Sequence, residues 1–381
     1  MNHKKVKEAF SSLMQFAGIT VNGDRPYDIQ VHNDAFYSRV LSQTALGLGE
    51  SYMDRWWDCL SIDQFIDRLM RVNLVNRLRR DWFTTWNIIK ARVLNLQTPD
   101  RACLVGKKHY DIGNDLYQRM LDRRMQYTCG YWENADSLDA AQEAKLRMIC
   151  QKTHLGPDMR VAELGCGFGG FAQYAAQNYG ARVTGYTISK EQARYARNLC
   201  QGLPVDIRLE DYRKARGTYD RVISIGLMEH VGYKNYPAYM RLAGRLLKAD
   251  GIAFIHTIGS NVSSSTCNPW TTKYIFPNAV LPSIAQLGKA MEGQFVMEDW
   301  QNLGENYDKT LMAWWKNFKT AWPKLAPAYG DRFYRMWKYY LLSCAGGFRS
   351  RDLQLWQIVM TRPGRQRPER PCLDFQNLRS V

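Results

Sequence analysis

The stretch VAELGCGFGG, whose glutamate is Glu163, constrains the fold of this chain more than any other part of its sequence. An apolar run, a carboxylate and closely spaced glycines are typical of a strand that turns tightly into a helix. Two glycine rules fit these letters. Gly165, Gly167 and Gly170 meet the dinucleotide rule G-x-G-x-x-G, whereas Glu163, Gly165, Gly167 and Gly169 meet the rule acid-x-G-x-G-x-G.

The carboxylate of Glu163 distinguishes the two rules. A buried carboxylate would repel a dinucleotide pyrophosphate. It would attract the ammonium and sulfonium of S-adenosylmethionine, by several kcal/mol at an effective dielectric constant of about 20. The stretch therefore favours a sulfonium nucleoside, with Glu163, Gly165 and Gly167 among the residues that bind it.

The remainder of the chain from about residue 105 predicts the sheet to which this turn belongs. Short β-branched runs alternate with amphipathic helices, the pattern of a parallel sheet with helices on both faces. The expected strands are residues 160–164, 181–186, 205–209, 220–225 and 252–258, and the later runs 295–303 and 353–361 complete seven. We therefore expect an α/β fold, the Rossmann-like class I S-adenosylmethionine-dependent methyltransferase fold.

Composition predicts further parts and a cellular location. We expect a small helical N-terminal domain over residues 1–95, a linker over 96–104 and a catalytic domain over 105–381, with a late helical insertion at about 305–347. No apolar run reaches the roughly 18 residues of a membrane helix, which favours a cytoplasmic protein. Nine cysteines without a C-x-x-C pair argue against a disulfide framework or a structural zinc, so no metal is expected.

The charge of the chain points to an anionic partner, since the formal net charge is +16. A basic segment with apolar residues at helical spacing surrounds Arg77, Arg79 and Arg80. Such a helix suits the headgroups of an anionic bilayer, with the protein held peripherally at the inner face of the membrane. A helical domain that exposes its arginines to water is the alternative.

Candidate nucleoside contacts follow the second and third strands. The second strand lacks the acid that usually holds a ribose, so Thr187 would serve with its hydroxyl, and Gln192 could help. S-K-E-Q at 189–192 also fits a capping box, which leaves the role of Gln192 open. After the third strand, Asp211 could bond to an adenine and Tyr212 could stack on it.

Several longer motifs are the basis of a specific resemblance. They are HYDIGNDLY (109–117), MQYTCGYW (125–132), GLMEHVG (226–232), HTIGS (256–260), KYIFPN (273–278), NYDKTLMAWW (306–315) and CAGGFRSRDLQLWQ (344–357). With them the chain resembles the cyclopropane-fatty-acyl-phospholipid synthases over nearly all of residues 105–360. The segment GLGESYMDRWWD resembles the extra domain of the bacterial phospholipid-modifying branch. Glu163 and Thr128 stand where related enzymes often carry Asp and Ser.

This resemblance implies transfer of a methyl group from S-adenosylmethionine to the cis double bond of a phospholipid acyl chain, followed by proton loss and ring closure. It adds Tyr127, Thr128, Ile188 and His230 to the cofactor contacts. It further implies a bound bicarbonate ion as the base, and a homodimer. The catalytic residues that would hold this ion are Cys129, Glu229, His256 and Tyr307, with the backbone of Ile258. Cys344 receives no role.

Aromatic side chains could stabilise the carbocation of this reaction through their faces. We expect two or three of the following to do so and the others to be ordinary core: Tyr127, Tyr131, Trp132, Tyr274, Phe276, Tyr307, Trp314 and Trp315.

Other functions remain open at this point. A nucleic-acid methyltransferase would also be basic, but the Asn/Asp-Pro-Pro-aromatic motif of amino-group methylation is replaced by GLMEHVG, so no nucleic-acid partner is expected. A lipid C-methyltransferase that leaves a branched methyl product is the nearer alternative. A membrane-surface module with a nucleoside pocket but no turnover is the non-enzymatic one.

Overall fold

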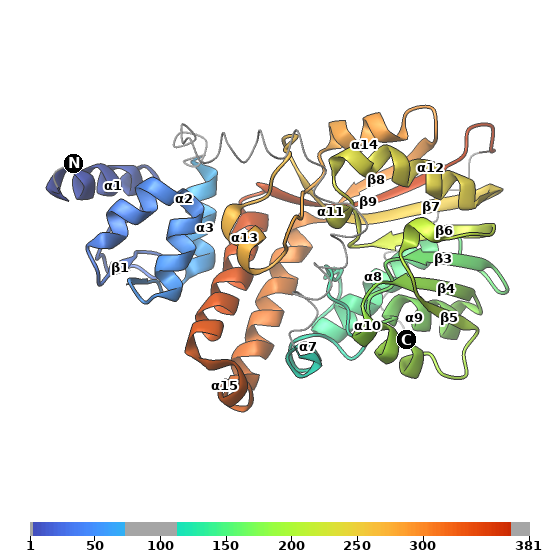
Figure 1. Cartoon of the computed structure of the whole chain (residues 1–381), viewed down its shortest axis with the longest axis horizontal. Coiled ribbons are helices and arrows are strands. Elements are labelled where there is room, and N and C mark those ends of the chain that lie inside the picture. The colour runs from blue at the N-terminus through green and yellow to red at the C-terminus, as the bar shows by residue number, and fades with distance from the viewer. Residues whose placement is uncertain (1–2, 73–112, 367–381) are drawn as a thin grey trace. The chain divides into compact units, whose positions relative to one another are not determined.

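The computed structural model describes residues 3–72 and 113–366 (Figure 1). The chain forms two compact units. Unit 1 combines Met1–Leu94, Ser265–Asn278 and Tyr307–Leu353, and unit 2 combines Asn95–Ser264, Ala279–Asn306 and Gln354–Val381. The predicted linker at 96–104 lies outside the described residues, so the domain boundary expected there stays a prediction.

Unit 2 is built on the seven-stranded sheet of the expected fold, with strand order β5-β4-β3-β6-β7-β9-β8. The strands are β3 (Arg160–Leu164), β4 (Arg182–Thr187), β5 (Val205–Leu209), β6 (Tyr219–Ile225), β7 (Leu247–Ser260), β8 (Val296–Asn302) and β9 (Leu353–Thr361). Strands β3 to β7 pair with one another in parallel, and β8 pairs antiparallel with β9. All seven predicted strands are present, although β7 begins five residues before the predicted 252.

Helices cover both faces of this sheet (Figure 1). The helices of unit 2 are α7 (Asn114–Met120), α8 (Leu138–Lys152), α9 (Gly170–Tyr179), α10 (Lys190–Leu199), α11 (Met228–Val231), α12 (Tyr236–Leu246) and α14 (Ile284–Met291), with short 3-10 helices η1 (Tyr212–Lys214) and η2 (Tyr233–Asn235). One core contains residues of α12 and α14, and the other contains residues of α8, α9 and α10. Val161 and Ala162, neighbours on β3, belong to opposite cores, as the period of two in a strand requires.

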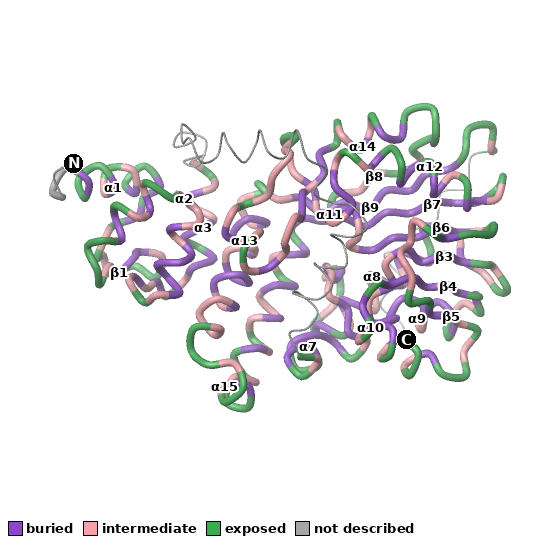
Figure 2. Tube along the Cα trace, in the orientation of Figure 1, coloured by how far each residue is buried: buried purple, intermediate pink, exposed green. Residues whose placement is uncertain are grey.

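Burial explains why the inner strands are almost continuously apolar. Figure 2 shows β3, β6 and β7 buried along most of their length, whereas the edge strand β8 is mostly exposed or half-buried. Strands that are covered by helices on both faces need apolar side chains on both. Each buried aliphatic side chain contributes roughly 1.5–3 kcal/mol to the stability of these cores.

Unit 1 is mainly helical. Its elements are α1 (His3–Phe16), β1 (Gln30–Val31), α2 (Ala35–Met53), β2 (Trp57–Asp58), α3 (Ile62–Arg71), α13 (Pro269–Tyr274) and most of α15 (Gly304–Arg349). The antiparallel pair β1 and β2 corrects the expectation of an entirely helical N-terminal part. Two-residue strands are too short to show an alternating pattern in the sequence.

The late insertion is helical, as expected, but it is two helices joined within α15. Gly330 breaks the helix with φ 73° and ψ 166°, a conformation that only glycine adopts readily. Pro323 and Pro327 precede the break and remove two helical N–H donors. Trp314 in the first helix and Trp337 in the second are fully buried, so both belong to the hydrophobic core of unit 1.

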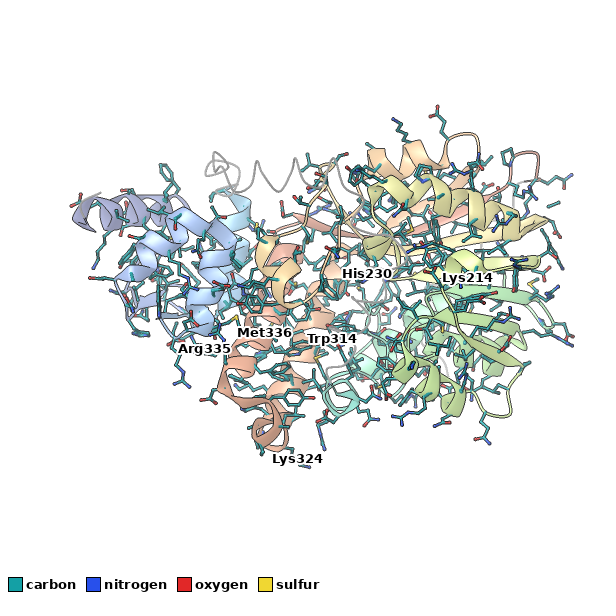
Figure 3. The ribbon with its side chains drawn as sticks, in the orientation of Figure 1. Lys214, His230, Trp314, Lys324, Arg335 and Met336 are labelled. Atoms are coloured by element: carbon teal, nitrogen blue, oxygen red, sulfur yellow. The ribbon has the colours of Figure 1, made fainter. Side chains whose placement is uncertain are left out.

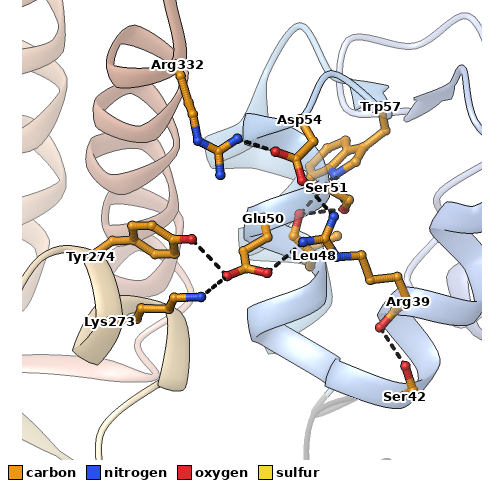
Figure 4. A network of polar contacts seen from close by, with 10 residues as sticks. All are labelled: Arg39, Ser42, Leu48, Glu50, Ser51, Asp54, Trp57, Lys273, Tyr274 and Arg332. Carbon is orange, nitrogen blue, oxygen red and sulfur yellow. Dashed lines mark hydrogen bonds and ion pairs between the residues drawn. The ribbon is translucent and has the colours of Figure 1, made fainter. Parts of the chain in front are cut away.

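A network of charged residues connects the separate segments of unit 1 (Figure 4). Glu50 on α2 accepts hydrogen bonds from Lys273 at 2.5 Å, from Tyr274 at 2.8 Å and from Arg39 at 2.6 Å. Burial opposes the ionisation of Glu50, but these three donors prevail and lower its pKa to about 2. Tyr274, one of the aromatics considered for cation stabilisation, therefore holds this network with its hydroxyl.

No helix in the described part of the chain is both long and apolar enough to cross a bilayer.

Candidate active site

Polar residues of unit 2 gather where its central parallel strands end. Glu163 lies at the end of β3, Thr187 ends β4, Glu229 follows β6 in α11, and His256 lies near the end of β7. Glu163 is paired in register with Ile223, and Ile225 is paired with His256. Since ligands of open α/β sheets bind outside the carboxyl ends of the strands, this edge is the candidate active site.

The turn after β3 shows why each glycine of the two rules is needed. Gly165, Gly167 and Gly169 have φ values of +81°, +52° and +83°, which residues other than glycine rarely adopt. Gly170 has no positive φ, and it is needed because a Cβ there would collide with the backbone of Arg124. The backbone thus meets the acid-x-G-x-G-x-G rule at all three glycines, and because Gly170 is needed as well, the carboxyl of Glu163 is what distinguishes the two rules.

Glu163 beside this turn is buried, with 2% of its surface exposed. Burial raises the pKa of its carboxyl to about 8, although the positive charge of Lys145 acts in the opposite direction. Its Oε2 atom has no hydrogen-bond partner among the described residues. A buried carboxyl with an unused acceptor fits a cationic nucleoside that carries hydroxyl and ammonium donors.

The end of β4 shows which hydrogen bonds Gln192 forms within the protein. Ser189 caps α10 by accepting the backbone N–H of Gln192, but the box is not completed. The Thr187 hydroxyl donates to Gln192 Oε1 at 2.9 Å, and it accepts the N–H of Ser189 at 3.2 Å. Thr187 and Gln192 are thus joined at the predicted ribose position beside the exposed Ile188, and their contact with a nucleoside stays a prediction.

The other predicted nucleoside contacts also lie in unit 2. Asp211 accepts the N–H of Arg213 at 2.9 Å and caps η1, and the ring of Tyr212 packs edge-on against Tyr239 at 6.0 Å. Burial lowers the pKa of His230, which follows Glu229 in α11 (Figure 3), to about 4. Tyr127 packs edge-on against a second aromatic ring, Tyr117, with 5.2 Å between centroids.

The segment with Thr128 and Cys129 is held by α8. Gln142 Nε2 donates to the Thr128 carbonyl at 2.7 Å, and Lys145 Nζ donates to the Thr128 hydroxyl at 2.9 Å. The Cys129 thiol is fully buried and donates to the carbonyl of Gly130 at 3.1 Å. Gly226 at the end of β6 approaches Thr128 so closely that a Cβ would lie 2.8 Å from its methyl group.

Glu229 is the carboxyl between the ends of β6 and β7. Its Oε1 accepts the backbone N–H of Ile258 at 2.6 Å, while its own carbonyl accepts the N–H of Val280 at 2.9 Å. Burial raises its pKa to about 7, although the hydrogen bonds to the carboxylate act in the opposite direction. Oε2 has no partner in the described residues. Glu229 is therefore poised to exchange a proton near neutral pH.

His256 lies two residues before Ile258 on β7 and is 1% exposed. Burial, and then the charges of Lys145 and Lys152, lower its pKa well below the ordinary value, so the imidazole is neutral. Nδ1 lies 3.4 Å from Gln357 Nε2, whereas Nε2 has no hydrogen-bond partner within the described ranges.

Three of the four predicted anion ligands of unit 2, Glu229, His256 and Ile258, thus lie where β6 and β7 end. Cys129 follows Thr128, whose methyl group lies close to Gly226 at the end of β6. The fifth ligand belongs to unit 1. There Tyr307 stacks on Phe348 with 4.5 Å between ring centroids. Its membership of the anion site stays a prediction. The backbone N–H of Ile258 donates to the carboxylate of Glu229, a hydrogen bond that the sequence did not indicate.

Arg77, Arg79 and Arg80 lie outside the described residues, and their membrane contact stays a prediction.

Sequence reasoning missed Gln142, Lys145 and Lys152, all buried on α8. Their spacing of three and seven residues places them on the same face of the helix as Leu138 and Ile149. A lysine at a position that the period assigns to the apolar face was the available signal, because a buried charge needs a specific partner.

Known proteins are similar to this chain over most of its length. The family described as mycolic acid cyclopropane synthetase matches residues 97–358. The cyclopropane-fatty-acyl-phospholipid synthase of Escherichia coli (strain K12) is 52% identical over 352 residues, which is 92% of this chain and 92% of that protein.

Two solved structures show the same likeness over part of the chain. The cyclopropane synthase MmaA2 from Mycobacterium tuberculosis has a TM-score of 0.65 at 25% identity and covers 68% of this chain and 98% of its own. The mycolic acid cyclopropane synthase CmaA1, solved with SAH and CTAB, has a TM-score of 0.64 at 28% identity with the same coverage.

Proposed function

This chain belongs to the mycolic acid cyclopropane synthetase family, and we propose that it converts cis double bonds of unsaturated phospholipid acyl chains into cyclopropane rings. S-Adenosylmethionine, when bound, supplies an electrophilic methyl group and leaves as S-adenosylhomocysteine. One alkene carbon gains the methyl carbon, the other becomes cationic, and loss of one proton from the new methyl group provides the electron pair that closes the ring.

The observation that carries this proposal is the pair of buried groups at the ends of β6 and β7. Glu229 Oε2 and His256 Nε2 are both buried and have no hydrogen-bond partner among the described residues. Both belong to the edge of the sheet that carries the Glu163 turn. Buried acid–base groups beside a methyl-donor site suit a reaction in which methyl transfer must be followed by deprotonation in the absence of water.

We further propose that a bicarbonate ion, when bound, removes the proton. Glu229 would accept the hydroxyl proton of this ion, and His256 would contact its oxygens, since each has one atom left to bond. The pKa of Glu229, raised to about 7 by burial, suits proton exchange with such a weak acid. Cys129, Ile258 and Tyr307 complete the proposed set by resemblance.

The partners are part of the same proposal. The formal net charge of +16 supports peripheral binding to the anionic inner face of the membrane. We assign that binding to the segment with Arg77, Arg79 and Arg80, we place the protein in the cytoplasm, and we expect a homodimer.

The test is to incubate the purified protein with S-adenosylmethionine and vesicles of a cis-unsaturated phospholipid. We expect a mass gain of one methylene, loss of vinyl protons and appearance of high-field ring protons in the NMR spectrum of the lipid. A methylene gain without ring protons would replace ring closure with formation of a branched product. No gain would overturn the lipid acceptor, and binding of S-adenosylhomocysteine would then test the cofactor site separately.

A further inference from the structure

We propose that Lys145 is a positioning residue of this site: its ammonium holds the Gln126–Cys129 segment and provides the fixed positive charge that admits an anion beside Cys129 and His256. The proposal deepens the proposed function and rests on its bicarbonate step.

The geometry around Lys145 is that of a buried, specifically placed ammonium. The residue is 0% exposed on α8, and its Nζ donates to Gln126 Oε1 at 2.7 Å and to Thr128 Oγ1 at 2.9 Å. Both acceptors are neutral. An ammonium has three donors, so one remains after these two bonds.

Lys145 differs in this respect from the other buried lysine of α8. Lys152 forms an ion pair with Asp299 at 2.8 Å, whereas no carboxylate of the described residues lies within ion-pair distance of Lys145. A buried ammonium whose direct hydrogen-bond acceptors are both neutral is costly to retain. The charge of Lys145 is thus available to a ligand.

The field of Lys145 acts on groups of both halves of the site. It acts on Glu163 beside the nucleoside turn and on His256 near the end of β7, and the side chains that act on Lys145 in return are Asp122, Cys129 and Glu163. The anion ligands proposed in unit 2 include no other cation, because the imidazole of His256 is neutral. The charge of Lys152 also acts on His256, but Lys152 is already paired with Asp299. An anion that enters this buried place therefore depends on Lys145 for its counter-charge.

The hydrogen bonds of Lys145 also explain why its charge lies beside the Gln126–Cys129 segment. Thr128, which receives the ammonium, directly precedes Cys129, and the carbonyl of Thr128 is held by Gln142 from the same helix. Lys145 thus orients the segment that carries both the proposed nucleoside contact, Thr128, and the proposed anion contact, Cys129. Loss of the charge alone should weaken the binding of the anion. Loss of the charge and the hydrogen bonds together should also disturb the conformation of the Gln126–Cys129 segment.

The experiment compares Lys145→Gln, which removes the charge but can still donate one hydrogen bond, with Lys145→Met, which removes both. Lys248→Met is the matched control, because this lysine is part-exposed and pairs with Asp220 at 2.8 Å at the start of β7, away from the site. Ring formation on cis-unsaturated vesicles is measured in carbon-dioxide-depleted buffer with increasing bicarbonate. Binding of S-adenosylhomocysteine is measured by calorimetry.

We expect Lys145→Gln to raise the bicarbonate concentration for half-maximal rate about tenfold or more, with S-adenosylhomocysteine affinity within about threefold of the parent. Lys145→Met should show the same change with a further loss of maximal rate. Lys248→Met should match the parent. A parental bicarbonate response in Lys145→Gln would overturn the inference while leaving the proposed reaction intact.

Two further outcomes are informative. If the parent forms rings with no response to bicarbonate, the bicarbonate step of the proposed function fails and the inference fails with it. If neither variant folds, the parent is titrated instead. The pKa of Lys145 is lowered to about 8 by burial, and the nearby acidic groups Asp122, Cys129 and Glu163 act in the opposite direction. The bicarbonate concentration that gives half-maximal rate should then rise as the pH increases through 8. A concentration that does not change with pH would overturn the inference.

Discussion

The Oε1 atom of Glu229 accepts the backbone N–H of Ile258 at 2.6 Å, so the helix after β6 is tied directly to the end of β7. This bond fixes the direction of Oε2, the atom proposed to exchange a proton with the bound base. It also restricts what a substitution at position 229 can test, because the side chain must still accept the N–H.

Glu229→Gln meets that condition, since an amide oxygen accepts the Ile258 N–H but the side chain cannot take up a proton. We expect the rate of ring formation to fall about 10²- to 10⁴-fold, which is the usual contribution of general acid–base groups. The melting temperature and the affinity for S-adenosylhomocysteine should stay close to those of the parent. Ring formation within about threefold of the parent would exclude Glu229 from proton exchange.

Glu163→Gln should change how stability depends on pH. The folded-state pKa of Glu163 is raised to about 8, so the folded protein holds a proton that the unfolded chain releases near 4.5. The protonated carboxyl stabilises the fold below pH 4.5 relative to higher pH, and this contribution is lost as pH rises toward 8. A tenfold difference in proton affinity between the folded and unfolded chains corresponds to about 1.4 kcal/mol.

The measurement is the melting temperature of parent and Glu163→Gln between pH 5 and pH 8 without cofactor. We expect the variant to gain stability relative to the parent as pH rises. A constant difference between the two proteins over this range would mean that Glu163 does not carry the raised pKa.

Glu50→Ala should destabilise unit 1, because it leaves Arg39 and Lys273 without their common carboxylate. We expect a loss of about 2 kcal/mol or more in urea unfolding of the full chain, as for other partly buried networks. The pKa of Glu50 is lowered to about 2, so its contribution is present above pH 4.5 and is lost as pH falls toward 2. Asp331→Asn, which breaks the exposed pair with Arg55, is the control and should have no measurable effect.

Replacing Arg77, Arg79 and Arg80 with Glu should weaken binding to anionic vesicles, with the larger loss at low salt, where charges are screened least. Co-sedimentation at two ionic strengths measures this effect. Vesicles of neutral lipid are the control, because they should bind parent and variant alike. Unchanged co-sedimentation with anionic vesicles would remove this segment from the membrane contact.

The sequence predicted the sheet well because its signals are local. The seven strands were visible as short apolar runs between helical patterns, and the Glu163 turn was visible as a carboxylate and alternating glycines. Gln192 was undecided, since the same four letters serve a capping box and a nucleoside contact. The strands β1 and β2 were missed because two residues do not establish a period.

The sequence by itself determined the family, the order of elements and the residue types that could perform the chemistry, since each depends on neighbouring letters or on recurring motifs. Tertiary structure decided that Glu229 would be bound by Ile258 and that the buried ammonium of Lys145 would be received by Gln126 and Thr128. Burial in turn decided which of these groups titrate near neutral pH. Such properties depend on what surrounds a side chain in space, and residues far apart in sequence provide those surroundings.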